Sequence, residues 1–281
     1  MTRGIPHHRS LPMYVCHAVG IAGPFFVPFR WGYVGLAVAL YLIRMLALSG
    51  GFHRYFAHRS YRTGRGFQFV IAFLGGTCAQ RGVLWWAGNH RHHHRYSDAP
   101  EDLHSPRQQG FFWSHVGWIL SKRHAETRNE LVRDFARFPE LRWLDRHHVV
   151  PPLVMLGTLL LAGGVPAAIW GAFTSSVLLW HLTFTINSLA HTVGSARYPT
   201  GDDSRNNPVL ALLTLGEGWH NNHHHYPSSS TFGFFWWELD LTYWVLKALE
   251  AAGLIWDVRE IPAEARDRLP RSVAPDVEVG P

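Results

Sequence analysis

Two short segments of this chain repeat the same arrangement of histidines. The first contains His90, His93 and His94, and the second contains His220, His223 and His224, so each follows the pattern His-x-x-His-His. On a helix, the second and third histidines follow the first by about 300° and about 400°, so the three imidazoles should converge on one point. Imidazole is a good ligand for iron, zinc and copper. The repeated spacing therefore predicts a metal site.

Each segment also contains one further histidine that the same geometry excludes. His92 lies about 200° around the helix from His90, and His225 lies about 500° beyond His220. Both side chains are therefore expected to point away from the metal site.

Other histidines join the set through their positions at the ends of apolar segments. His53 and His58 would diverge by about 140° on a regular helix, so they must lie where a helix ends or bracket two metal ions. Asn187 and His191 are four residues apart and share a helix face, which makes Asn187 a candidate amide or water-holding neighbour. The candidate metal ligands are His53, His58, His90, His93, His94, His191, His220, His223 and His224.

Nine imidazoles exceed the needs of one metal ion, whereas two ions with four or five ligands each would use them all. A structural zinc site is closed by four ligands. Two adjacent metals beside a membrane instead suggest activation of dioxygen for reaction with an apolar substrate.

Four apolar segments could position these ligands, because a membrane crossing needs about 20 residues. The expected spans are residues 13–29, 31–49, 149–169 and 171–190, with the last two hinged at residues 163–166. Arg44 lies within the second span and should face protein or reach the interface. The apolar segment 67–79 is short and is expected to stay on the cytoplasmic side, so that all the histidines can meet. The predicted fold is an all-α integral membrane protein with four transmembrane helices and a cytoplasmic helical cap holding a histidine-rich dimetal site.

Charge and composition support this organisation. The cap is expected at residues 52–147 and 192–256, and its first part has 15 Lys/Arg against 8 Asp/Glu, as the positive-inside rule requires of a cytoplasmic segment.

Residues 234–256 suggest an interfacial helix or, equally well, ordinary packing against the cap. Residues 1–12 are expected to form a cytoplasmic arm, residues 13–256 a single domain, and residues 257–281 a loose tail. With only 2 cysteines, the chain has no disulfide framework. Little beyond the net charge of +6 favours nucleic-acid binding.

The histidine segments resemble those of a known family. The stretches His53–His58, His90–His94, Asn187–His191 and Gly216–His224 are similar to the histidine boxes of the membrane fatty acyl-CoA desaturases, the stearoyl-CoA (delta-9) desaturase family, of a bacterial type. Gly110–Trp118 extends the resemblance, which covers roughly residues 30–256. It implies a four-span, mushroom-shaped fold and a di-iron centre held by the nine histidines, with Asn187 holding a water on one iron. The implied reaction uses O₂ to introduce a cis double bond, at position 9, into a saturated fatty acyl chain.

The resemblance also implies partners and further residues. The substrate would be a fatty acyl chain carried by CoA or by another acyl carrier. The carrier stays open because this chain has Arg81-Gly82 where the animal acyl-CoA enzymes have polar and acidic residues. Electrons would come from an external donor such as a ferredoxin, a flavin reductase or a cytochrome b5-type protein. The site would face the cytoplasm at a bacterial inner membrane. Candidate tunnel residues are Trp86 and Phe184, and the carboxylates expected to orient imidazoles are Glu217, Asp98 and Asp102.

Two other functions remain open from the residues. A di-iron membrane hydroxylase of acyl chains or alkanes would use the same ligands. A metal-binding or transport protein would instead place ligands along a path through the bundle, where only His17 and His181 lie. At His181, either a helix carbonyl satisfies the imidazole or the ring lines an internal cavity, and we slightly favour the carbonyl. We expect His104, His115 and His124 to be ordinary hydrogen-bonded residues.

Overall fold

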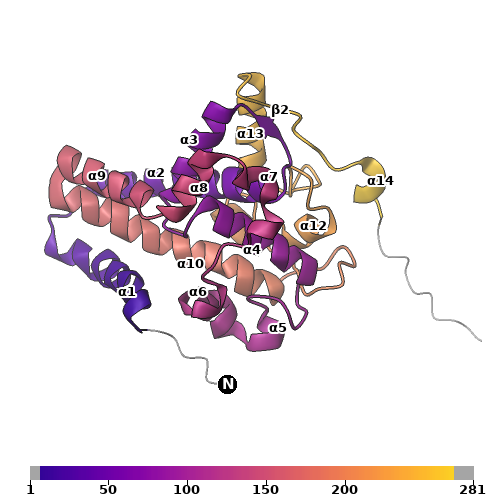
Figure 1. Ribbon diagram of the computed structural model, residues 1–281, viewed down its shortest axis with the longest axis horizontal. Helices are drawn as coiled ribbons and strands as arrows, with labels where there is room; N and C mark the ends of the chain where they lie inside the picture. Colours follow the sequence, from indigo (N-terminus) through magenta and orange to yellow (C-terminus); the bar gives the residue numbers. More distant parts are fainter. Residues whose placement is uncertain (1–6, 269–281) are drawn as a thin grey trace, which may run out of the picture.

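The computed structural model describes residues 7–268, so the first six residues of the expected arm and the tail from residue 269 lie outside the described part. The described chain is helical apart from one small antiparallel sheet, in which β1 (Arg62–Thr63) pairs with β2 (Ile255–Trp256). Figure 1 shows the long helices α1, α2, α9 and α10 extending toward one side, with the shorter helices gathered around their other end.

The long helices follow the apolar segments of the sequence. They are α1 (His7–Ala22) with the 3₁₀ turn η1 (Gly23–Phe26); α2 (Trp31–Leu46) with the π-helix η2 (Ala47–Ala57); α9 (Val150–Ala168); and η6 (Ile169–Thr174), α10 (Ser175–Ser188) and η7 (Leu189–His191). Two continuous stretches, Trp31–Ala57 and Val150–His191, are long and apolar enough to cross a membrane, and Leu11–Phe26 is a shorter apolar helix. The described residues thus support two such stretches, and the four-span count stays a prediction.

The second stretch is a hairpin. Gly164 has φ 65° and ψ −161°, which is not a helical conformation, and Pro166 follows it. A positive φ is accessible to glycine without the steric cost that a Cβ would add. The chain therefore reverses inside the hinge predicted at residues 163–166, and α9 packs against η6.

Arg44 faces protein and not lipid. Its side chain is buried, its Nε donates to Leu40 O at 3.1 Å, and its guanidinium also bonds to Ser176 Oγ at 2.8 Å and to Ser175 Oγ. These bonds join α2 to α10. Satisfying the donors in this way is what permits a guanidinium inside an apolar bundle.

The cap consists of short helices between and after the long ones. They are α3 (Arg65–Gly76), α4 (Val83–Tyr96), α5 (Pro106–Gln109), η3 (Trp113–Gly117), α6 (Trp118–Leu120), η4 (Lys122–His124), η5 (Asn129–Leu131), α7 (Arg133–Ala136), α8 (Pro139–Arg146), α11 (Pro208–Leu213), α12 (His220–His225), α13 (Leu241–Ala251) and α14 (Ala263–Arg266). Phe52, Phe56, Leu84 and Leu141 are fully buried members of the main core, which joins η2, α4 and α8. This packing holds the two histidine-bearing helices η2 and α4 side by side.

Two apolar segments of the cap are amphipathic. Helix α3 buries Ile71 and Ala72 but exposes Phe69 and Val70. The helix expected over residues 234–256 is shorter than predicted. Only α13 (residues 241–251) is helical there, and a turn precedes it. Trp236 in that turn is 88% exposed and Trp244 in α13 is 53% exposed, which is typical of side chains at a membrane interface.

Candidate metal centre and substrate cavity

His53 and His58 come together because the helix that carries them is wound as a π-helix. The backbone N–H of His58 donates to His53 O at 3.1 Å, an i to i+5 bond, and the two ring centroids are 5.0 Å apart. A π-helix aligns residues five apart, whereas an α-helix separates them. The divergence expected from a regular helix therefore does not occur, and His58 is also the residue at which the helix ends.

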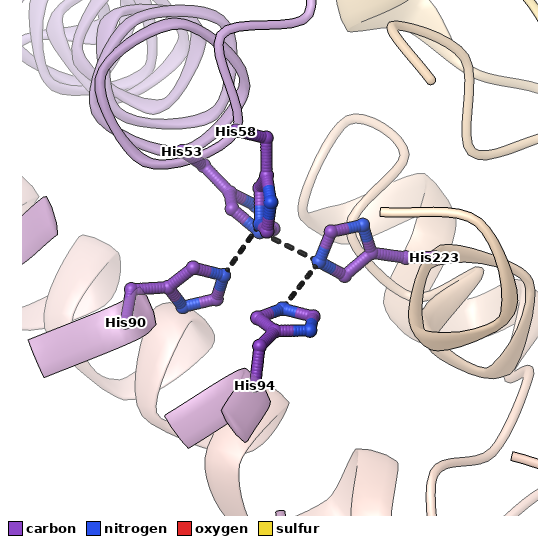
Figure 2. A group of neighbouring side chains, drawn as sticks. All are labelled: His53, His58, His90, His94 and His223. Atoms are coloured by element: carbon purple, nitrogen blue, oxygen red, sulfur yellow. Dashed lines mark hydrogen bonds between the residues drawn. The ribbon is translucent and has the colours of Figure 1, made fainter. Parts of the chain in front are cut away.

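Five histidines form one cluster of imidazoles, shown in Figure 2. Their ligand nitrogens all lie within 4.8 Å of one another, and they come from η2, α4 and α12. The Nε2 atoms are 2.9 Å apart for the pairs His53–His223, His58–His90 and His94–His223. Neighbouring ligands of one metal with bonds of about 2.0–2.1 Å would lie about 3 Å apart. This five-histidine cluster consists of His53, His58, His90, His94 and His223.

Four further histidines form a second cluster from α4, η7 and α12. The Nε2 atoms of His191 and His220 are 3.0 Å apart. The Nε2 atoms of His93 and His224 are buried and have no hydrogen-bond partner among the described residues. A buried nitrogen without a partner is costly, so these orphaned atoms fit a site built for a metal ion. This four-histidine cluster consists of His93, His191, His220 and His224.

Each His-x-x-His-His motif supplies both clusters. In α4, His90 and His94 join the five-histidine cluster while His93 joins the other; in α12, His223 is separated from His220 and His224 in the same way. The expectation that the three imidazoles of a motif converge on one point is therefore wrong. The three histidines of a motif share one broad helix face, but its second and third histidines are consecutive residues and differ in direction by about 100°. This difference is enough to direct one ring to a different cluster.

Four carboxylates hold the ring nitrogens that face away from the clusters. Asp98 lies 2.9 Å from His191 Nδ1, Asp102 lies 3.0 Å from His93 Nδ1, and Glu217 contacts His53 Nδ1. Asp202 lies 2.6 Å from His224 Nδ1. Such a contact fixes the Nδ1–H tautomer and leaves Nε2 free for a metal. Asp98, Asp102 and Glu217 were candidates from the sequence; Asp202 was not, because no spacing in its polar loop connects it to a histidine.

The electrostatics of the cap agree with this arrangement. Burial would raise the pKa values of Asp98 and Asp102, but their contacts with His191 and His93 outweigh it and hold both pKa values below the usual range. Burial, reinforced by neighbouring imidazoles, lowers the pKa values of His90, His94, His220 and His223 well below 6.5. These four rings are therefore neutral at physiological pH, which is the form that binds a metal.

His92 and His225 lie outside both clusters, as expected. The Nε2 atom of His92 is 3.0 Å from Glu101 O. That of His225 is 2.9 Å from Ala265 O, and its ring stacks on Tyr198 with centroids 3.9 Å apart.

A cavity of about 870 Å³ opens from the clusters into the long helices. At the cluster end its lining includes His53, His90, His93 and His220 together with Asn187 and Glu217. The lining also includes Met45 of α2, Leu48 of η2, and Ala172 and Phe173 of η6. The two candidate tunnel residues, Trp86 and Phe184, both line it, and Trp86 stacks on His90 with centroids 5.0 Å apart. The volume of the cavity and its mostly apolar lining suit one small, mostly apolar ligand.

Three histidine predictions differ from the structure. His124, expected to be an ordinary hydrogen-bonded residue, is buried, and its Nδ1 has no partner among the described residues. His104, expected to be an ordinary hydrogen-bonded residue, lines the cavity 4.4 Å from the His93 ring, and its buried Nδ1 has no partner in the described chain. His181 is held by two other imidazoles and not by a helix carbonyl, since its Nε2 is 3.1 Å from His17 Nε2 and its Nδ1 is 3.0 Å from His115 Nε2. This row of rings joins α1, α10 and η3.

These features define a helical protein in which two apolar stretches of membrane-spanning length lead to two histidine clusters able to bind metal ions and to a cavity with a mostly apolar lining. The chain belongs to the fatty acid desaturase family, whose model matches residues 29–259. It is therefore an oxidoreductase of fatty acyl chains, in a family associated with membranes.

Individual relatives extend over most of the chain. It is 36% identical over 256 residues to the sn-2 palmitoyl-lipid 9-desaturase of Nostoc sp. (strain 36), covering 89% of each chain. It is 35% identical over 256 residues to the chloroplastic palmitoyl-monogalactosyldiacylglycerol delta-7 desaturase of Arabidopsis thaliana, covering 89% of this chain and 67% of that one. It is 33% identical over 263 residues to the icosanoyl-CoA 5-desaturase of Limnanthes douglasii, covering 92% and 73%.

Proposed function

We propose that this protein introduces a cis double bond, at position 9, into a saturated fatty acyl chain, using O₂ and two iron ions. The observation that carries the proposal is the gathering of nine imidazoles, as five and four, at one end of an apolar cavity. Membership of the desaturase family supports it.

The chain's own residues suit two iron ions. The five-histidine cluster would hold one and the four-histidine cluster the other, with Asn187, which lines the same cavity as His220, holding a water on the second. When bound, the irons would supply the redox chemistry that couples reduction of O₂ to removal of two hydrogens from adjacent methylenes. In balance, one methylene pair, O₂, two electrons and two protons give one double bond and two waters.

Protein side chains position the substrate and the ligands. Trp86, stacked on His90, and Phe184 would press the acyl chain against the metal end of the cavity, so that one pair of methylenes faces the histidines. The apolar lining excludes water from the reacting carbons. Glu217, Asp98, Asp102 and Asp202 would keep four imidazoles in the tautomer that binds iron.

The acyl carrier and the bond position are separate parts of the proposal. The relatives include desaturases named for lipid-linked and for CoA-linked substrates, and for positions 9, 7 and 5. We propose acyl-CoA, because Lys122 and His148 line the cavity together with Arg81 and could meet its phosphates. A membrane lipid is the alternative carrier.

We further propose four membrane crossings, with the cap and the metal centre on the cytoplasmic face of a bacterial inner membrane. The hairpin at Gly164 supports two crossings within Val150–His191, while α1 and α2 supply the others. In this arrangement residues 13–256 are one domain, and an external protein donates the electrons.

Expression in a host that lacks its own desaturase tests the proposal. Total fatty acids would be analysed by gas chromatography with mass spectrometry, with a compatible reductase present and with His223→Ala as the inactive control. We expect new monounsaturated chains with the bond at carbon 9. Hydroxylated chains would instead assign a hydroxylase. Feeding labelled acyl-CoA or labelled phospholipid to membranes identifies the carrier.

A further inference from the structure

We infer that buried carboxylates make the two metal positions unequal, so that the iron in the four-histidine cluster is oxidised before the iron in the five-histidine cluster. The inference rests on the proposed function, which places one iron in each cluster. Each oxidation converts Fe²⁺ to Fe³⁺, and in the proposed reaction the electron passes to O₂. Asp98, Asp102 and Asp202 are thus positioning residues, which act on the metal through their histidines and set the order of the two oxidations.

Contacts between carboxylates and ring nitrogens are distributed unequally over the two clusters. In the four-histidine cluster three rings place Nδ1 against an aspartate: His93 lies 3.0 Å from Asp102, His191 lies 2.9 Å from Asp98, and His224 lies 2.6 Å from Asp202. In the five-histidine cluster, only His53 has such a contact within the described residues, with Glu217. The Nδ1 atom of His223, in the same cluster, is buried without a hydrogen-bond partner in that part of the chain.

The three aspartates are held in their ionised form. Asp202 accepts from the Thr200 hydroxyl at 2.7 Å and from the Ser204 hydroxyl and backbone N–H at 2.6 and 3.1 Å. The backbone N–H of Asp98 donates to Asp102 at 2.8 Å, and Asp98 itself accepts from a hydroxyl and from a backbone N–H. An ionised carboxylate accepts hydrogen bonds and donates none, which is the pattern found here. The side chains of Asp98, Asp102 and Asp202 are 0%, 0% and 5% exposed, so water screens their charges weakly.

The three negative charges are not offset by an arginine or a lysine in direct contact. Within the described residues, the ion pairs of Asp98, Asp102 and Asp202 are all with histidines. Arg107 lies on the same side of the cap but donates to Asp203 at 2.7 Å, at the surface. The four-histidine cluster therefore keeps the negative charge of its carboxylates.

The single carboxylate of the five-histidine cluster has a cation beside it. The guanidinium of Arg54 is fully buried and lies 3.7 Å from Glu217, and it also pairs with Asp240 at 3.0 Å. The positive charge of Arg54 offsets part of the charge of Glu217. The five-histidine cluster thus has fewer carboxylate contacts than the other cluster, and its one carboxylate is partly neutralised.

This difference favours Fe³⁺ in the four-histidine cluster. Oxidation adds one positive charge to the metal, and nearby buried anions stabilise that charge because the protein interior screens it poorly. An imidazole that donates its Nδ1–H to a carboxylate is also a more basic ligand. The additional imidazole of the five-histidine cluster is a neutral ligand and adds no negative charge. The lower reduction potential is therefore expected at the four-histidine cluster.

A redox titration followed by Mössbauer spectroscopy tests the order. The full-length protein in nanodiscs, loaded with isotopically enriched iron and fully reduced, would be oxidised stepwise by ferricyanide, which takes up the electrons. We expect two separate one-electron steps with a mixed-valent state between them. Asp202→Asn should make the first oxidation about tenfold less favourable, which is an upward shift of about 59 mV, and should change the equilibrium constant of the second less than about twofold.

Three further variants separate charge from packing. Glu217→Gln should shift the second step and leave the first in place, because Glu217 contacts the other cluster. Asp202→Glu keeps the charge and should keep the first potential. Glu140→Gln is the matched control, since Glu140 pairs with Arg65 and contacts no cluster histidine in the described chain, and it should move neither step. Iron would be present in excess and its content measured; if Asp202→Asn does not retain two irons, Asp98→Asn makes the same test through His191.

The outcomes distinguish this inference from the proposed function. A wild-type protein whose two irons are oxidised in one step would overturn the inference, and so would a first step that moves with Glu217→Gln and not with the aspartate variant. If such a protein still formed monounsaturated chains, the proposed function would stand without the inference. Two ordered steps in a protein that forms no unsaturated product would support the inference and contradict desaturation. A protein that binds no iron would overturn both.

Discussion

The imidazole of His53 lies against that of His58, with ring centroids 5.0 Å apart, although five residues separate them. The i to i+5 bond of the π-helix η2 produces this contact. It brings both rings into one cluster with His90, His94 and His223, and it does so at the end of an apolar helix. Single π-helical turns are often found at functional sites, and here the winding directly sets the ligand geometry.

Replacing His93 by Ala should remove metal, whereas replacing His92 should not. His93 supplies a buried, unpartnered Nε2 to the four-histidine cluster, while His92 points to Glu101 O outside it. We expect His93→Ala to lose about half or more of the bound iron and to be inactive. His92→Ala should keep its iron and its activity. Elemental analysis of the purified variants gives the answer, and equal iron loss in both would contradict the ligand assignment.

Asp202 should control metal affinity through His224. Asp202→Asn keeps the shape of the side chain but removes the negative charge 2.6 Å from His224 Nδ1. We expect iron affinity to fall about 10- to 100-fold, measured by competition with a chelator. Asp203→Asn is the matched control, because the Asp203 carboxylate pairs with Arg107 at the surface and touches no cluster histidine. A wild-type affinity in Asp202→Asn would mean that this carboxylate does not tune the centre.

The far end of the cavity should limit the length of the acyl chain. Ala172 lines it on η6, and a leucine there would fill space that a long chain needs. We expect Ala172→Leu to shift the product distribution toward chains shorter by about two carbons or more, since each lost methylene contact is worth about 0.8 kcal/mol. Gas chromatography of the products measures the shift. Ala251→Leu, the same change at an exposed position of α13, should leave the distribution unaltered.

The metal-free protein should lose stability as the pH falls below about 6.5. Burial lowers the pKa values of His90, His94, His220 and His223 in the folded state, so below that pH the unfolded chain binds more protons. Stability from these groups is therefore present above pH 6.5 and is lost as the pH decreases. His93 opposes them, because despite its burial Asp102 raises its pKa, but it is one group against four.

Thermal unfolding of the apo-protein between about pH 5 and 8 measures this dependence. A melting temperature that rises as the pH falls below 6.5 would contradict it.

Local spacing predicted which histidines gather in the two clusters. Helical geometry correctly excluded His92 and His225, because their direction depends only on positions within one helix. It did not predict the division of each motif between two clusters, since that depends on where α4 and α12 lie relative to η2 and η7. The π winding of η2 was also not predicted, because the spacing of His53 and His58 was interpreted on a regular α-helix.

Long-range partners were the hardest to foresee. Asp202 reaches His224 from a loop 22 residues away, and the row His17–His181–His115 joins residues that are far apart in the sequence. Polarity of a loop residue says nothing about which ring it will meet after folding. The apolar segments predicted the long helices and the hinge at residues 163–166. The number of membrane crossings is not fixed by the length and composition of the helices alone.

The division of α12 between the two clusters has a consequence for biosynthesis. By the time residue 94 has left the ribosome, four of the five ligands of the five-histidine cluster are already made, but only His93 of the other cluster exists. Both clusters still wait for one short helix, which supplies His223 to the first and His220 and His224 to the second. Neither can close before translation passes residue 224, so a truncated nascent chain holds no complete site, and the two centres mature together.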